Sequence, residues 1–497
     1  MNQQIIDFQT AENNLLACAA YLAEKIKSSD GRAEAMKAIV AHYLVKNEVD
    51  TAAQFADSVE DSFDRDRLLI EAADKCAATD DDEDALQLAD AIEDAGFQAD
   101  ARERIAVCKA EKFQFDKAFE IVETVDHSSN ALGAIAAELQ KSGDESRAME
   151  TLSKVEDAAT KANFSQIIAL KFNENGNSEK AVNLLEAARE ETKNIETAEE
   201  KIRTLQGISD SFSEIGRKDK SIEVLSEAQS HAELLGGVHR NSILSRISVG
   251  FLQAGSLDLA DRTLDLVSDK TTIASTLSAF ASEFHEQGEA REALETLEEA
   301  YALLKSERDR EIRDSRLRFG VFGSIAVRFA VFGKPERAIE IALENPLESE
   351  RYSALSQIAQ ICVSKGKDDL AHQAVNKIGE ESEKTAALIG MSDAEQKAEN
   401  PVESLNLLRE AYSHVRDIPQ LSARTSLLNE LAVRFWKKDE TDLARNISLE
   451  SLQIISHILD DSHKAVALSN LAAVYEKLGF ELNAPEKDVM RTMLRRA

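Results

Sequence analysis

Residues that interrupt or cross-link a chain are scarce in this sequence. Its 497 residues include only 5 Pro, 19 Gly, 4 Cys and 1 Trp, and only 5% are aromatic. Few prolines and glycines favour long helices over sheets or disordered linkers. The cysteines lack CxxC spacing and the density of a disulfide scaffold, so we expect them to be reduced and buried.

Long apolar runs are also missing. No stretch approaches the ~20 apolar residues of a membrane span. The first residues, MNQQIIDFQT, have neither the basic start nor the apolar core of a secretory signal. The sequence therefore predicts a cytoplasmic protein that has no membrane partner.

Basic residues are in the minority. Lys and Arg total 59 against 91 Asp and Glu, which gives a formal charge of −32. Phosphate backbones are bound mainly by Lys and Arg, and no strongly basic strip occurs, so DNA and RNA are excluded as partners. The acid excess either keeps a large surface soluble or steers a basic partner.

Motifs that carry chemistry are absent. His285-Glu286 lacks the second His of an HExxH zinc site, and the acidic run 80–84 lacks the Gly and distal Glu of a calcium loop. Acids at a helix start are stabilised by the helix dipole, which explains that run more simply. We predict no cofactor, no metal site and no enzymatic activity.

The sequence contains an internal repeat. A turn residue, in most cases followed five positions later by Ala, recurs thirteen times, at spacings that cluster at 33 and at 39 to 40. Helices commonly end on a residue in the left-handed conformation, which favours Gly and then Asn or Asp. The predicted turn residues are Asn47, Asp80, Phe113, Gly143, Gly176, Gly216, Gly255, Gly288, Gly333, Gly366, Asn400, Asp439 and Gly479.

Each turn separates two amphipathic segments. Positions −11, −8, −7 and −4 relative to the turn form one helix face, as in Leu244, Ile247, Ser248 and Phe251 before Gly255. Position −7 is Ala nine times and Ser twice, and position +5 is Ala in eleven repeats, with Ser221 and Leu405 as exceptions. Small residues on both segments let two helices approach closely, so each repeat is predicted to be a helical hairpin.

This order of large apolar residue, small residue, aromatic residue, turn and Ala resembles the tetratricopeptide repeat, although the early Trp and closing Pro of that family are missing. The resemblance implies an all-α, right-handed α-solenoid of about 13 helix-turn-helix repeats. We expect an N-terminal capping helix in residues 1–31, the repeat solenoid in 32–484 and a C-terminal capping helix in 485–497.

In tetratricopeptide proteins the side of the first helix that carries positions −13 and −10 lines a concave groove. Over eight repeats these sixteen positions contain no carboxylate and a single charge, Arg203, where composition predicts about five charged residues. Amides and hydroxyls could hydrogen-bond to an extended peptide. The predicted groove residues are Asn130, Asn163, Gln166, Arg203, Gln206, Ser242, Ser245, Ser275, Ser278, Ser353, Ser356, Ser426 and Asn429, with Gly133, Gly320 and Gly323 between them.

Two functions fit this pattern. The first is a non-catalytic scaffold that binds a protein or peptide segment in the groove. The second is a structural, self-assembling repeat protein, in which the small residues pack on another copy. The small residues could also serve only to let neighbouring helices fit together.

Overall fold

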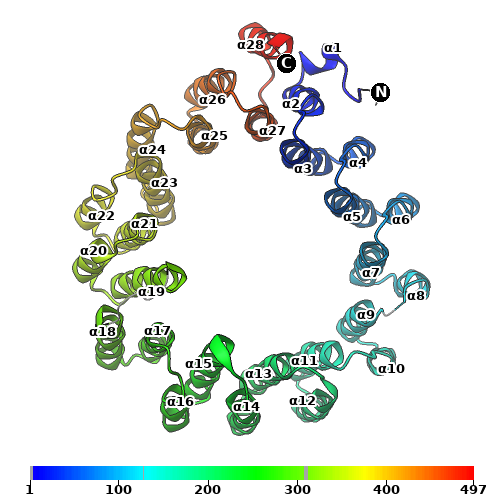
Figure 1. Ribbon diagram of the computed structural model, residues 1–497, viewed down its shortest axis with the longest axis vertical. Coiled ribbons are helices and arrows are strands. Elements are labelled where there is room, and N and C mark those ends of the chain that lie inside the picture. The colour runs from blue at the N-terminus through cyan, green and yellow to red at the C-terminus, as the bar shows by residue number, and fades with distance from the viewer. Residues whose placement is uncertain (1–3, 127, 307–311, 497) are drawn as a thin grey trace. The chain divides into compact units, whose positions relative to one another are not determined.

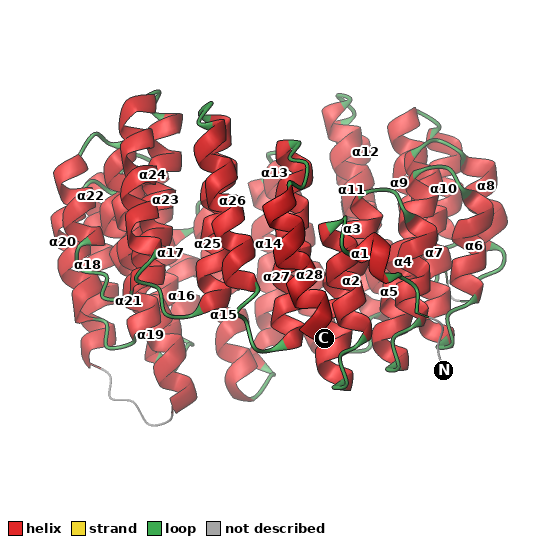
Figure 2. Ribbon diagram, turned by 90° about the horizontal axis from the view of Figure 1, so that it is seen from above, coloured by secondary structure: helices red, strands yellow, loops and turns green. Residues whose placement is uncertain are grey.

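The computed structural model describes residues 4–126, 128–306 and 312–496. Within these ranges all regular structure is helical, in 28 α-helices and one short 3-10 helix (Figures 1 and 2). From α3 onward the helices pair into thirteen hairpins, α3 with α4 through α27 with α28. The predicted all-α solenoid of about 13 repeats is therefore confirmed. Below, the odd-numbered helix of each hairpin is called the first helix and the even-numbered one the second helix.

The chain divides into two compact units, and each is described by itself. Unit 1 combines residues 1–101 with residues 351–497, and unit 2 spans residues 102–350. The boundaries fall inside α7 (Ala95–Glu111) and α21 (Glu348–Ser364).

The other helices of unit 1 are α1 (Phe8–Ala11), α2 (Leu15–Glu24), α3 (Ser29–Val45), α4 (Val49–Asp57), α5 (Ser62–Ala78), α6 (Asp82–Asp90), α22 (Asp368–Val375), α23 (Glu381–Lys397), α24 (Pro401–Val415), α25 (Leu421–Lys437), α26 (Thr441–Ile455), α27 (Asp461–Leu478) and α28 (Ala484–Arg496). Those of unit 2 are α8 (Phe115–Val122), α9 (Ser129–Ser142), α10 (Glu145–Ser153), α11 (Ala158–Glu174), α12 (Ser178–Glu191), α13 (Ala198–Glu214), α14 (Lys218–Glu233), α15 (Gly237–Gln253), α16 (Leu257–Leu264), α17 (Lys270–Glu286), α18 (Ala290–Ser306), α19 (Ile312–Val331) and α20 (Pro335–Glu344).

The hairpin turns lie where the sequence places them, with one exception. Twelve of the thirteen predicted turn residues have a positive φ, including Phe113 at 59°. The exception is Asn400, for which the prediction was wrong: φ is 61° at Glu399 and −110° at Asn400. Asn400 precedes Pro401, and the proline ring disfavours helical conformations in the residue before it, so the left-handed position moves back by one.

This shift restores small residues at positions −7 and +5, which together form the seam between the two helices of a hairpin. Counted from Glu399, position −7 is Ser392 and position +5 is Ser404, which replaces the apparent exception Leu405. Both serines are at most 1% exposed, as is Ser221 at the other non-alanine +5 position. The +5 alanines are fully buried except Ala484, which is exposed because α28 begins three residues later after its turn than the other second helices do.

Aromatic residues at position −4 build the core of unit 2. Phe172, Phe212 and Phe251 come from three successive first helices and are at most 3% exposed. They belong to one continuous apolar cluster that runs from α9 to α17. Because each hairpin completes the core of its neighbour, the first helices are held side by side in one layer.

In unit 1 the two ends of the chain pack on each other. Helices α2 and α3 lie against α27, and α28 contacts both α26 and α2 (Figure 1). Polar contacts join the same elements: Arg491 pairs with Glu12 at 2.8 Å, and the Ser462 hydroxyl donates to Glu34 at 3.1 Å. The terminal segments thus cover each other's apolar faces.

Candidate binding surface on the first helices

The predicted groove residues separate into two rows. Position −13 is exposed at Asn130, Asn163, Arg203, Ser242, Ser275, Ser353 and Ser426. Position −10 is half-buried at Gln166, Ser245 and Ser356, and buried at Gln206, Ser278 and Asn429. Nine of these thirteen residues lie in unit 2 and four in unit 1, so unit 2 carries most of the predicted surface.

Position −10 is where neighbouring first helices touch. The Ser245 and Thr276 hydroxyls of α15 and α17 are 2.6 Å apart. A Cβ atom at Gly133 would overlap the ring of Phe164 on α11. Small residues at −10 therefore allow close packing, and only the −13 row presents its side chains freely to solvent.

A cavity of about 440 Å³ opens in unit 1 and one of about 310 Å³ opens in unit 2. The unit 2 cavity lies on the first helices α13, α15 and α17. Three predicted groove residues, Gln206, Ser245 and Ser275, line it, and Leu225, Val249 and Ala279 supply apolar surface. Its volume is within the range of sites that hold a small molecule or a peptide side chain.

Gln206 is the most informative residue of this cavity. Its side chain is 5% exposed, and its Oε1 atom is buried without a hydrogen-bond partner in the described part of the chain. Leaving a buried amide group unsatisfied costs roughly 1–3 kcal/mol. Gln206 thus marks a place in the cavity wall where a hydrogen-bond donor is missing.

The cavity also carries one charge of each sign. Asp210 and Arg246 both line it, and both side chains reach solvent. Desolvation by the surrounding protein raises the pKa of the Asp210 carboxyl group, and the positive charge of Arg246 opposes this shift. Sequence reasoning missed both residues because it considered only positions −13 and −10, whereas they occupy −6 and −9.

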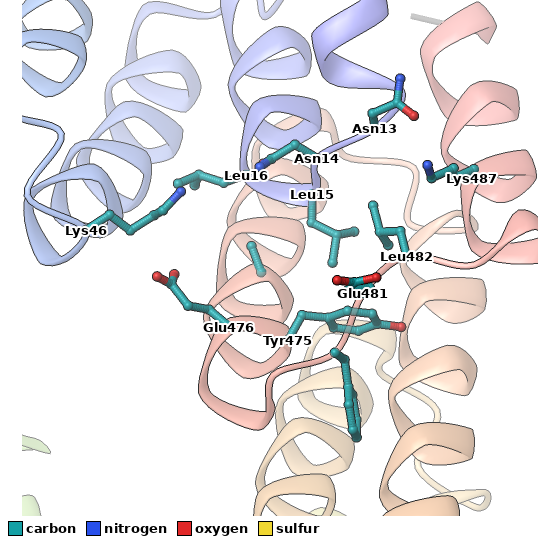
Figure 3. Close-up of a pocket in the computed structure, with 12 residues that line it drawn as sticks. Asn13, Asn14, Leu15, Leu16, Lys46, Tyr475, Glu476, Glu481, Leu482 and Lys487 are labelled. Atoms are coloured by element: carbon teal, nitrogen blue, oxygen red, sulfur yellow. The ribbon is translucent and has the colours of Figure 1, made fainter.

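The unit 1 cavity lies where the chain ends meet. Figure 3 shows Asn13, Leu15 and Lys46 of the N-terminal segment facing Tyr475, Glu481 and Lys487 of the C-terminal segment. Two of its polar groups have partners nearby: Lys46 pairs with Glu48 at 2.7 Å, and the Tyr475 hydroxyl donates to the buried carboxylate of Glu486 at 2.9 Å. We regard this cavity as part of the packing between the ends.

The described residues bring together no three His, Cys, Asp or Glu side chains that could hold a metal ion. Cys18, Cys76 and Cys362 are buried, and burial raises the pKa of the Cys18 thiol to about 12 and that of Cys76 to about 11. Cys18 and Cys76 are thus protonated core residues near neutral pH. Across the same described ranges, no helix has the length and apolar character needed to span a bilayer.

No protein-family model and no curated protein matches this sequence. Solved structures do match. Aspartyl phosphate phosphatase F from Bacillus subtilis is 12% identical, with 88% of this chain and 96% of that chain covered and a TM-score of 0.28. A signal-transduction ATPase with a tetratricopeptide repeat sensor from Pyrococcus horikoshii is 13% identical, with 73% and 67% covered and a TM-score of 0.27. Ton1535 from Thermococcus onnurineus NA1 is 17% identical, with 81% and 98% covered and a TM-score of 0.25. The assignment of this chain to tetratricopeptide-like architecture rests on its own hairpins, turns and seams.

Proposed function

We propose that this chain is a non-catalytic, cytoplasmic scaffold that binds a protein or peptide segment along the first helices of unit 2. The unit 2 cavity carries the proposal, because it places the unsatisfied amide of Gln206 beside Ser245 and Ser275. Amide and hydroxyl groups can donate to and accept from the main chain of an extended segment.

The exposed −13 row extends this surface beyond the cavity. Asn130, Asn163, Ser242 and Ser275 are neutral and exposed, in a chain whose formal charge is −32. A neutral strip avoids the repulsion that an acidic surface would exert on acidic parts of a partner. Many weak polar contacts along one layer suit the capture of an unstructured segment.

Self-assembly is the competing function. Repeat arrays polymerise when an uncovered terminal repeat meets a second copy. In unit 1 the terminal segments cover each other through α2, α3 and α27, which leaves fewer apolar faces for end-to-end stacking. We propose that residues 1–31 and 485–497 cap the array in this way.

The proposal is tested by charging the exposed row. A partner is first identified by affinity purification from the native cytoplasm and mass spectrometry, and its binding segment is synthesised. The double variant Ser242→Glu/Ser275→Glu should abolish binding of that segment without changing the melting temperature. Ser226→Glu, at an exposed serine of the second helix α14, is the matched control and should bind normally.

Unchanged binding by the double variant would exclude this surface. A mass in solution of two or more chains, together with no segment captured, would support the self-assembling alternative instead.

A further inference from the structure

Arg328 of α19 is a half-buried cation that pairs with no carboxylate in the described part of the chain. Its Nε atom donates to the Ser282 hydroxyl at 2.7 Å, and its Nη1 atom donates to the Ser278 hydroxyl at 3.0 Å. Both serines belong to the neighbouring first helix α17. A guanidinium group has five N–H donors, so three remain for another acceptor. Among the described residues, Arg328 makes no ion pair.

Arg434, a second arginine at the same repeat position, has the carboxylate partner that Arg328 lacks among the described residues. Arg434 of α25 also lies five residues before its turn residue and contacts position −6 of the preceding first helix. There the −6 residue is Asp393, which accepts from Arg434 Nη2 at 2.8 Å and from Nε at 3.0 Å. In the α17 and α19 pair, position −6 is Ser282, and the carboxylate is replaced by a hydroxyl.

The electrostatic surroundings of the two arginines differ accordingly. Burial lowers the pKa of Arg328, and no neighbouring charge offsets that effect. For Arg434 burial acts in the same direction, but Asp393 and Glu430 outweigh it and raise the pKa. In a chain with 91 acidic residues, an uncompensated half-buried arginine is the exception.

We propose that Arg328, together with Ser278 and Ser282, holds a carboxylate of the peptide segment bound along the first helices of unit 2. This inference rests on the proposed function and adds a requirement for an acidic group in the partner. The serines fix the guanidinium plane, and the free N–H groups form charge-assisted hydrogen bonds to the carboxylate. A phosphate group carries nearly two negative charges and would call for a second cation. Among the described residues, Arg328 is the one cation that hydrogen-bonds to Ser278 and Ser282.

The same helix carries the cavity wall and the carboxylate site. Ser275, Thr276 and Ala279 of α17 line the cavity, while Ser278 and Ser282 contact Arg328. Packed helices lie about 8–10 Å apart, and an extended peptide advances about 3.3 Å per residue. A segment crossing from α15 past α17 to α19 spans two such spacings, which places its acidic residue about five to six positions from the residue in the cavity.

The test uses the full-length protein and a display library of randomised 12-residue peptides. Peptides selected on the wild-type chain should carry Asp, Glu or a free C-terminal carboxylate. Replacing that acid by its amide should weaken binding about tenfold or more, as expected for a charge-assisted hydrogen bond. Arg328→Gln should cause a similar loss.

Ser282→Asp supplies the missing internal carboxylate, as Asp393 does for Arg434, and leaves Arg328 in place. It should weaken binding of the selected peptides about tenfold while the melting temperature is kept. Arg434→Gln is the matched control at the same repeat position and should bind them normally.

Selected peptides that need no acid and bind Ser282→Asp normally would overturn the carboxylate site but leave the proposed function standing. Tighter binding when phosphoserine replaces the acid would overturn the choice of a carboxylate. If no peptide is selected, both the site and the peptide-binding function are contradicted.

Discussion

The hydroxyl groups of Ser392 and Ser404 lie 2.9 Å apart across the hairpin of α23 and α24, and each donates to the other's backbone carbonyl, at 2.8 and 2.9 Å. The hydroxyl groups of Ser209 and Ser221 lie 2.8 Å apart between α13 and α14, and Ser209 also donates to the Ser221 carbonyl at 3.4 Å. Both hairpins have serine at −7 and at +5, where most repeats have alanine at both. The seam accepts two serines because each hydroxyl finds a partner there.

This reciprocity predicts that the two serines of a seam are energetically coupled. Ser392→Ala and Ser404→Ala should each lower the free energy of unfolding by about 1 kcal/mol, because each removes a buried hydrogen bond. The double variant restores an alanine seam and should cost less than the sum of the two. Denaturant unfolding of the four proteins measures the coupling, and strict additivity would contradict it.

The shifted turn before Pro401 gives a second prediction. Glu399 has φ 61°, a conformation that costs a side-chain-bearing residue about 1–2 kcal/mol and costs glycine little. After allowing for the greater freedom of glycine in the unfolded chain, Glu399→Gly should raise the free energy of unfolding by about 0.5 to 1 kcal/mol. Asn400→Gly should bring no gain, and the opposite ranking in thermal melts would show that the turn residue is Asn400.

Two helical glycines of unit 2 should respond oppositely to alanine. A Cβ at Gly133 overlaps the Phe164 ring, so Gly133→Ala should destabilise the chain by about 1–3 kcal/mol. At Gly320 the nearest atom would be 3.9 Å away, so Gly320→Ala should stabilise its helix by roughly 0.5–1 kcal/mol. Equal effects in calorimetry would mean that position −10 of α9 does not touch α11.

The packing of the chain ends should depend on pH. His42 of α3 lies within 2.5 Å of the Ser469 hydroxyl on α27, and burial lowers its pKa, against the opposing charge of Glu476. A lowered folded-state pKa means that the neutral form is favoured. The contribution of neutral His42 to the stability of the packed ends is therefore complete above the unfolded-state pKa of about 6.5. It is lost as the pH falls below that value.

Hydrogen exchange of α2 and α27 between pH 7 and pH 5, corrected for intrinsic exchange rates, measures this loss. His42→Gln should reduce the pH dependence, since glutamine does not titrate. Equal pH dependence in both proteins would assign the effect to other groups.

Periodicity was sufficient to predict the hairpins, because a left-handed turn residue and a small seam leave local marks such as Gly255 and Ala260. It misplaced the turn at Asn400 because the repeat pattern does not include the effect of Pro401 on the residue before it. The packing of α3 on α27 joins residues more than 400 positions apart, as His42 and Ser469 show, and no local pattern encodes it.

The groove was predicted only as a row of neutral residues. Whether a −10 residue such as Ser278 is exposed depends on how close the next first helix lies, which the repeat pattern does not specify. Arg328 could have been found by comparing repeats, since Arg328 and Arg434 share position −5 while only Arg434 faces an aspartate.

Site-specific photo-crosslinking tests the central claim most directly. A benzophenone side chain is placed at Ser275 on the first helices and, in a second protein, at Ser226 on the second helices. The account predicts that Ser275 crosslinks to a defined segment of a partner protein and that Ser226 does not. Crosslinks from Ser226 alone, or from Ser275 only to another copy of this chain, would contradict it.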